Sequence, residues 1–147
     1  MHIHENHEEI APILILLSRI HIDILIKRLR LIGFDGLTPS IATIIPLLDT
    51  QGIRPAALAL KAGVSKQAIS QLIKILENKD YALQMADRKD TRAKLVCLSQ
   101  RGEALREACA IIRGELYQIA IQTLGQHAVE HMKRDLSTLM DALILEQ

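Results

Sequence analysis

The chain carries a helix-turn-helix pattern in the stretch Pro55-Ala-Ala-Leu-Ala-Leu-Lys-Ala-Gly-Val-Ser-Lys-Gln-Ala-Ile-Ser-Gln-Leu-Ile-Lys-Ile-Leu-Glu-Asn-Lys79. It predicts a helix over residues 55–62, a tight turn, and a second helix over about residues 65–79. Proline suits the first turn of a helix, and Gly63 suits the left-handed conformation that ends one. Ser65 offers a side-chain oxygen that can cap the second helix.

The second of these helices has two chemically distinct faces. Ile69, Ile73 and Leu76, with Leu72, follow helical spacing and predict one buried stripe. The opposite face has hydroxyl, amide and ammonium groups and no carboxylate before Glu77, whereas a helix needing only solubility would usually include acids. Such groups suit phosphates and the edges of bases. We therefore predict a DNA-contacting set of Ser65, Lys66, Gln67, Ser70, Gln71 and Lys74.

A β-hairpin is predicted directly after this helix. Two alternating apolar segments, residues 81–86 and 93–98, flank a polar turn rich in cations. This is the layout of the wing of a winged helix, over about residues 81–98. We expect Arg88 and Lys89 at its tip to meet the minor groove or its phosphates. Arg92 has two open roles, a DNA contact or a pair with a nearby carboxylate (Asp87 or Asp90), and we slightly favour the pair.

The net charge of +1 conceals an asymmetry. Residues 55–101 contain nine Lys and Arg against four Asp and Glu, a balance of +5. The rest of the chain has nine cations against thirteen acids, a balance of −4. The positive field is thus concentrated on the helix-turn-helix and the hairpin, where phosphates would bind.

Composition excludes several function classes. Aromatic residues make up only 2% of the 147 residues, which argues against proteins that bind single strands by stacking bases on aromatic rings. We find no Gly-rich phosphate loop, no paired-carboxylate motif and no nucleophile–base set, so we predict no enzyme activity and no cofactor. The apolar content of 49% is sufficient for a sizeable core of aliphatic side chains.

Helices are predicted on both sides of this module. The first begins at Ile10 or Pro12, ends at Leu31, and is apolar on more than one face, so it needs cover from a second subunit. Thr38 and Pro39 start a helix that extends to Leu48 or Thr50, with a kink or an early end expected at Pro46. After the hairpin, Ser99 caps a long helix to Leu124, and Gly125 separates it from a last helix over residues 126–145.

The predicted fold class is mainly α with a small β-hairpin wing: a winged helix-turn-helix domain plus a helical dimerisation region. We expect an N-terminal dimerisation helix within residues 1–34, the DNA-binding domain at 37–99, and C-terminal dimerisation helices at 100–147. The acidic N-terminus does not resemble a secretory signal, and the uncharged apolar run at residues 10–18 is shorter than the roughly 20 residues that span a bilayer. We therefore expect a cytoplasmic protein that does not contact membranes.

The cysteines and histidines suggest functions other than DNA binding alone, namely redox sensing and metal binding. Cys97 and Cys109 lack a cationic setting that would activate a thiol, so we interpret them as small buried residues rather than redox sensors or a disulfide. His127 and His131 lie one helical turn apart, a spacing that can hold a metal, and His2, His4 and His7 cluster at the N-terminus. We favour surface histidines and predict no metal, but a metal-responsive regulator stays an alternative.

The chain resembles the MarR family of transcriptional regulators from about Ile10 to Leu145. The most specific likeness is in the wing, where Asp87-Arg88-Lys89-Asp90-Thr91-Arg92 and Leu98-Ser99-Gln100-Arg101-Gly102 match the family's pattern. Residues 63–70 match its turn and the start of its recognition helix. The chain departs from the family at Asp80, where glycine is usual, and at Gln71 and Gln84, where arginine is common.

This resemblance implies a homodimer, joined through the first and last helices, that binds a pseudo-palindromic duplex. Each recognition helix would enter a major groove, and each wing would reach toward a minor groove. The family also implies a ligand-responsive repressor whose small-molecule effector binds between the dimerisation helices and the DNA-binding lobe. The alternatives are the metal-responsive regulator and a protein-interaction module that keeps the fold without the DNA contacts.

Overall fold

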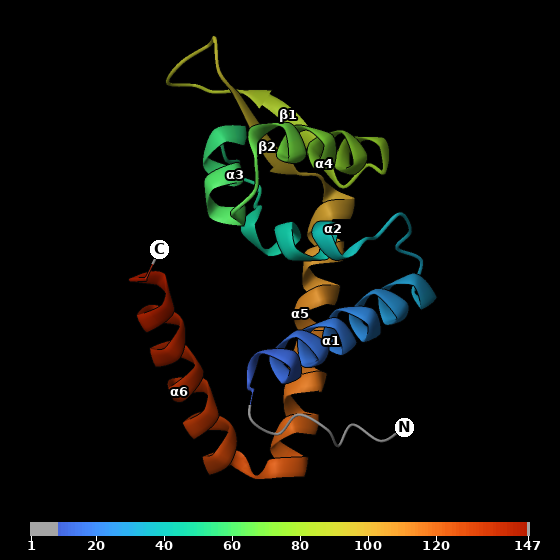
Figure 1. Cartoon of the computed structure of the whole chain (residues 1–147). Helices are drawn as coiled ribbons and strands as arrows, with labels where there is room; N and C mark the ends of the chain where they lie inside the picture. Colours follow the sequence, from blue (N-terminus) through green and yellow to red (C-terminus); the bar gives the residue numbers. More distant parts are fainter. Residues whose placement is uncertain (1–8, 147) are drawn as a thin grey trace. The chain divides into compact units, whose positions relative to one another are not determined.

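The computed structural model describes residues 9–146, which form helices and one hairpin in the predicted order (Figure 1). The chain divides into two compact units, the first running to Ala110 and the second beginning at Ile111. The predicted fold class, mainly α with a small hairpin, is confirmed. The elements are α1 (Ala11–Leu31), α2 (Pro39–Ile44), the 3-10 helix η1 (Ile45–Leu47), α3 (Pro55–Ala62), α4 (Lys66–Asn78), β1 (Ala82–Ala86), β2 (Lys94–Leu98), α5 (Gln100–Leu124) and α6 (Gln126–Ile144).

Local signals fix the helix ends around the helix-turn-helix. Gly63 ends α3 in the left-handed conformation, with φ of 65°. Ser65 caps α4, because its hydroxyl accepts the N–H of Ala68 at 3.1 Å. The Thr38 hydroxyl likewise accepts the N–H of Ile41 at 3.2 Å at the start of α2. All three ends match the sequence-based predictions.

Pro46 ends α2 early, as expected. The helix stops at Ile44, and the chain tightens into η1 with the proline inside it. A proline cannot donate an N–H to the preceding turn, so the longer helix is not continued. Leu48 leaves this turn in an extended conformation and remains buried.

The hairpin is a two-stranded antiparallel sheet in which Ala82 pairs with Leu98 and Ala86 with Lys94. One further strand-like contact was not predicted. Ile53, in the turn before α3, exchanges two backbone hydrogen bonds with Val96, of 3.1 and 2.9 Å. The base of the wing is therefore fastened to the start of the helix-turn-helix.

The core of the first unit consists of aliphatic side chains. Leu58, Leu76, Val96 and Leu105 are each 0% exposed. They come from α3, α4, β2 and α5, so each of these four elements contributes a fully buried side chain. The apolar stripe predicted for α4 is largely buried, and the hydrogen-bonding side chains of this helix are exposed.

Helix α1 is buried only in its second half. Leu25 and Leu29 are 1% exposed, whereas Ile13 and Leu17 are 56% and 55% exposed. Within residues 9–146, none of the helices has the length and apolar run needed to cross a bilayer. The exposed half of α1 therefore presents an apolar face without being a membrane span.

The second unit contains the end of α5 and all of α6. Gly125, with φ of 85°, makes the turn between the two helices. The Tyr117 hydroxyl donates a hydrogen bond to Glu130, and Lys133 lies 5.4 Å from the centre of the Tyr117 ring. The unit leaves large apolar side chains exposed, among them Ile111, Ile119, Met140, Leu143, Ile144 and Leu145.

Candidate DNA-binding surface

Helix α4 presents all of its predicted DNA-contacting side chains to solvent. Lys66, Gln67, Ser70, Gln71 and Lys74 are exposed along one side, opposite the buried Ile69 and Ile73. Ser65 is exposed at the start of the helix, where its hydroxyl is already used as the cap. The Ser70 hydroxyl donates to the Lys66 carbonyl at 2.8 Å and retains its acceptor capacity. The face thus offers amide, hydroxyl and ammonium groups together.

The electrostatics of this face favour an anionic partner. Within residues 9–146, no carboxylate lies within ion-pair distance of Lys66, Lys74 or Arg88. No acidic residue lies in the first turn of α4. These ammonium and guanidinium groups are therefore available to phosphates.

The wing tip is shaped by two aspartates. Asp87 Oδ1 accepts the N–H of Lys89 at 2.9 Å, and Asp90 Oδ1 accepts the N–H of Arg92 at 3.1 Å. The pKa of Asp87 lies below its usual value, first because of the Lys89 N–H and then because of the Arg54 guanidinium. The side chains of Arg88, Lys89 and Arg92 are exposed around this turn.

The partner of Asp87 corrects one prediction. The favoured pair of Arg92 with Asp87 or Asp90 is wrong: among the described residues both carboxylates have Arg54 as their ion-pair partner, and Asp87 Oδ2 binds Arg54 Nη2 at 2.7 Å and Nε at 3.0 Å. Arg54 Nη2 also lies 4.0 Å from Asp90 Oδ2. Arg54 precedes α3 and lies 33 residues from Asp87, so no local pattern marks the pair. The exposed side chain of Arg92 stays a predicted DNA contact.

Sequence reasoning also missed Asp35, in the segment between α1 and α2. Its carboxylate binds Lys79 Nζ at 2.5 Å and Arg101 Nη2 at 3.1 Å. The hydrogen bond from Lys79 is the main reason that the pKa of Asp35 lies below its usual value. Two of the nine cations counted for residues 55–101 are thus paired with an acid from outside that stretch.

Asp80 adopts the conformation for which glycine is best suited. Its φ of 57° is left-handed, and among residues 9–146 it alone does so without being glycine. Its carbonyl accepts a hydrogen bond from the Ser99 hydroxyl, and the Tyr81 carbonyl accepts the N–H of Ser99 at 3.1 Å. The turn before β1 is therefore kept despite the substitution, at the cost of local backbone strain.

The cysteines and the described histidines show no reactive or metal-binding geometry. Cys97 and Cys109 are reduced and buried, 2% and 1% exposed, and burial raises the pKa of the Cys97 thiol. His131 Nδ1 lies 3.0 Å from Asp135 Oδ2, and across the described part of the chain no three metal-ligating side chains come together. His2, His4 and His7 lie outside the described residues.

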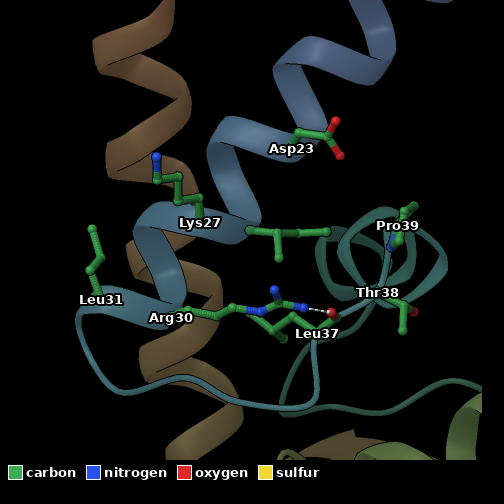
Figure 2. Close-up of a pocket in the computed structure, with 8 residues that line it drawn as sticks. Asp23, Lys27, Arg30, Leu31, Leu37, Thr38 and Pro39 are labelled. Atoms are coloured by element: carbon green, nitrogen blue, oxygen red, sulfur yellow. Dashed lines mark hydrogen bonds between the residues drawn. The ribbon is translucent and has the colours of Figure 1, made fainter.

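A cavity of about 570 Å³ lies between the second half of α1 and the start of α2 (Figure 2). Figure 2 shows Asp23, Lys27 and Leu31 coming from α1, and Thr38 and Pro39 coming from the opposite wall. Arg30 Nη2 donates to the Leu37 carbonyl at 3.1 Å and ties the two walls together. The lining combines apolar and charged side chains, as small-molecule sites commonly do.

The fold and the exposed face of α4 together define a winged helix-turn-helix protein. Solved structures of MarR-family regulators share this fold. MepR of S. aureus in complex with DNA matches with a TM-score of 0.74 at 20% identity, over 91% of this chain and 98% of that one. A probable transcriptional regulator from Pseudomonas aeruginosa matches with a TM-score of 0.72 at 23% identity, over 90% and 97%.

A structure of S. aureus MepR bound to ethidium bromide matches with a TM-score of 0.60 at 21% identity, over 95% of this chain and 99% of that one. No family model matches the sequence, and no curated protein does either. At these identities the likeness establishes the fold. The expected resemblance to the MarR family is thus confirmed at the level of architecture.

Proposed function

We propose that this chain is a sequence-specific double-stranded DNA-binding transcriptional regulator of the MarR type, a ligand-responsive repressor that acts in the cytoplasm as a homodimer. The observation that carries the proposal is the α4 face, where Lys66, Gln67, Ser70, Gln71 and Lys74 are exposed together and no carboxylate of the described residues lies within ion-pair distance of the two lysines. The DNA complex of MepR, which has the same fold, supports this assignment.

The contacts follow from side-chain chemistry. Gln67 and Gln71 can bond adenine bidentately in the major groove, and Lys66 and Lys74 suit guanine or phosphate. Arg88, Lys89 and Arg92 at the wing would reach the minor groove and its phosphates. The hydrogen bonds that fasten the wing to Ile53 and Arg54 would hold these cations at a fixed distance from α4.

A homodimer is supported by apolar side chains that each unit leaves uncovered. Ile13 and Leu17 of α1 and Met140 and Leu143 of α6 are all more than half exposed. Soluble proteins rarely leave such residues in groups unless another surface covers them. Two-fold symmetry would present two recognition helices to the two half-sites of a pseudo-palindromic operator.

The cavity between α1 and α2 is the proposed effector site. Its volume suits a small molecule, and MepR has been seen with ethidium bromide bound. A ligand there can release DNA only if it binds the DNA-free arrangement more tightly than the DNA-bound one. The chain has no tryptophan, so Leu31→Trp places the only tryptophan at this cavity, where it can be excited selectively. Compounds that change its emission without ever weakening operator binding would contradict the effector role.

The decisive experiment measures binding to a duplex from upstream of the chain's own gene at several salt concentrations. Lys74→Ala and Arg88→Ala should each weaken binding and reduce the steepness of the salt dependence by about one unit of slope per lost phosphate contact. Arg19→Ala, which removes an exposed cation of α1, is the matched control. Binding that does not depend on salt would favour a protein-interaction module instead.

A further inference from the structure

The carboxylate of Asp35 joins three parts of the DNA-binding lobe. Asp35 lies in the segment between α1 and α2, Lys79 directly follows α4, and Arg101 lies in the first turn of α5. Oδ2 is 2.5 Å from Lys79 Nζ, and Oδ1 is 3.1 Å from Arg101 Nη2. The two partners are 44 and 66 residues away in sequence, so the link depends on the folded structure.

The backbone of the same segment is also fixed. The Tyr81 hydroxyl donates to the Asp35 carbonyl at 2.9 Å, and Tyr81 itself is 1% exposed. Arg101 lies 5.0 Å from the centre of the Tyr81 ring, a favourable cation–π distance. Tyr81, just before β1, and Arg101, in the first turn of α5, therefore hold the same aspartate.

Gly36 shows that the segment is fitted to Lys79. Its φ is +67°, and a Cβ at this position would lie 2.6 Å from Lys79 Cε and 3.1 Å from Cδ. The aliphatic part of the lysine side chain thus lies across the glycine. This close approach directs the ammonium group of Lys79 toward Asp35.

We propose that Asp35 is a positioning residue for DNA recognition: it fixes the end of α4 against the lobe and withholds Lys79 and Arg101 from non-specific phosphate contacts. The inference rests on the proposed DNA-binding function. It adds a role for a negatively charged residue that touches no DNA. One wall of the α1–α2 cavity belongs to the same segment, through Leu37, so a ligand there would act close to this link.

Neutralising Asp35 should change DNA affinity in opposite directions, depending on whether its charge or its positioning role matters. Removing an acid from a DNA-binding lobe should tighten binding to every duplex, because the overall field becomes more positive. Loss of a positioning contact should instead weaken binding to the specific duplex, where the placement of α4 matters. The sign of the change in specific affinity distinguishes the two causes.

The experiment measures Asp35→Asn on the full chain with the own-promoter duplex and with a scrambled duplex of equal length. We expect affinity for the promoter duplex to fall by about tenfold, the size of a typical coupling between contacting residues, and affinity for the scrambled duplex to rise by a few-fold. Glu107→Gln removes another exposed carboxylate of the same unit and should not lower promoter affinity. Thermal unfolding of each variant checks that the fold is retained.

Lys79→Met tests the link from its other end. It breaks the same pair and removes one positive charge, so charge alone predicts an equal fall on both duplexes, whereas loss of the positioning contact should lower promoter affinity more than affinity for the scrambled duplex. Promoter affinity that is unchanged or raised in Asp35→Asn overturns the inference. If the wild type itself does not distinguish the two duplexes, the proposed function fails first, and that result is separate from the behaviour of the variants.

Discussion

The winged-helix lobe and the terminal helices differ in how far their large apolar side chains are buried. In the lobe, Leu58, Leu76 and Leu105 are 0% exposed. In the last helix, Met140 and Leu143 are 57% and 58% exposed, and Leu145, which follows it, is 86% exposed. Helix α1 contains both behaviours, because its second half is buried and its first half is not.

Each unit taken by itself therefore covers the core of the lobe but leaves the apolar side chains of its terminal helix exposed. Burying one large aliphatic side chain stabilises a protein by about 1.5–3 kcal/mol, so several uncovered ones represent a substantial unused driving force. Burial against a second copy is the simplest use of that force, in line with the proposed homodimer.

The largest effect is expected from a charge placed on α6, which tests whether this helix joins two copies of the chain. Leu143→Glu should convert a dimer into a monomer, with association at least about a thousandfold weaker, because a symmetric interface would bury the new carboxylates and lose two leucines. Sedimentation velocity across a protein concentration series measures this.

The matched control is Leu60→Glu. Leu60 is 84% exposed on α3 of the lobe, and its replacement should leave the association unchanged. A wild type that is monomeric at every concentration, or a Leu143→Glu variant that still dimerises, would contradict the proposed role of the terminal helices.

Within α5, Gly102 tests the tight packing of the lobe. A Cβ there would lie 1.9 Å from the Tyr81 carbonyl oxygen and 2.9 Å from Leu98 Cδ2. Gly102→Ala should therefore lower the free energy of unfolding by about 3 kcal/mol, since neither the backbone nor the core can yield easily. Urea unfolding followed by circular dichroism measures the change, and an unchanged midpoint would show that the lobe is looser than described.

The second glycine of the same helix should behave in the opposite way. A Cβ added at Gly114 would meet no other atom within 4 Å, and the backbone there is helical. Gly114→Ala should raise stability by about 1 kcal/mol, because alanine is the better helix former. The same urea titration compares the two variants, and destabilisation by Gly114→Ala would mean that a partner surface lies against this position.

Much of this architecture was predictable because its signals are local. Gly63, Ser65 and Thr38 act within one turn of their own position, and Pro46 ends α2 by its own chemistry. Helical and alternating periodicities likewise predicted the α4 stripe and the hairpin.

The contacts that position the site were not predictable in this way. Arg54 reaches Asp87 across 33 residues, and Asp35 reaches Lys79 across 44. Charged residues follow no period, so the sequence offers several partners for each, and Arg92 was expected to pair with either Asp87 or Asp90. The predicted DNA-contacting set stays a prediction, but its exposure on α4 followed from the sequence, because all of its members except the wing cations share one face of one helix.

The smallest expected effect concerns acid titration, and it again compares the two regions. The pKa of Asp87 in the wing is lowered first by the Lys89 N–H and then by Arg54, and the pKa of Glu130 in the second unit is lowered mainly by the Tyr117 hydroxyl. The pKa of such a carboxyl group in the unfolded chain is about 4. A carboxylate whose pKa is lowered by folding stabilises the fold above that pH, and this contribution is lost as the pH falls through the lowered pKa.

Arg54→Met should therefore move the pKa of Asp87 toward its usual value without reaching it, since the Lys89 N–H remains. Carbon-detected NMR of the carboxyl groups measures both residues, and Glu130 serves as the internal control. An Asp87 titration unaffected by Arg54→Met would show that the wing is held at its base without the arginine.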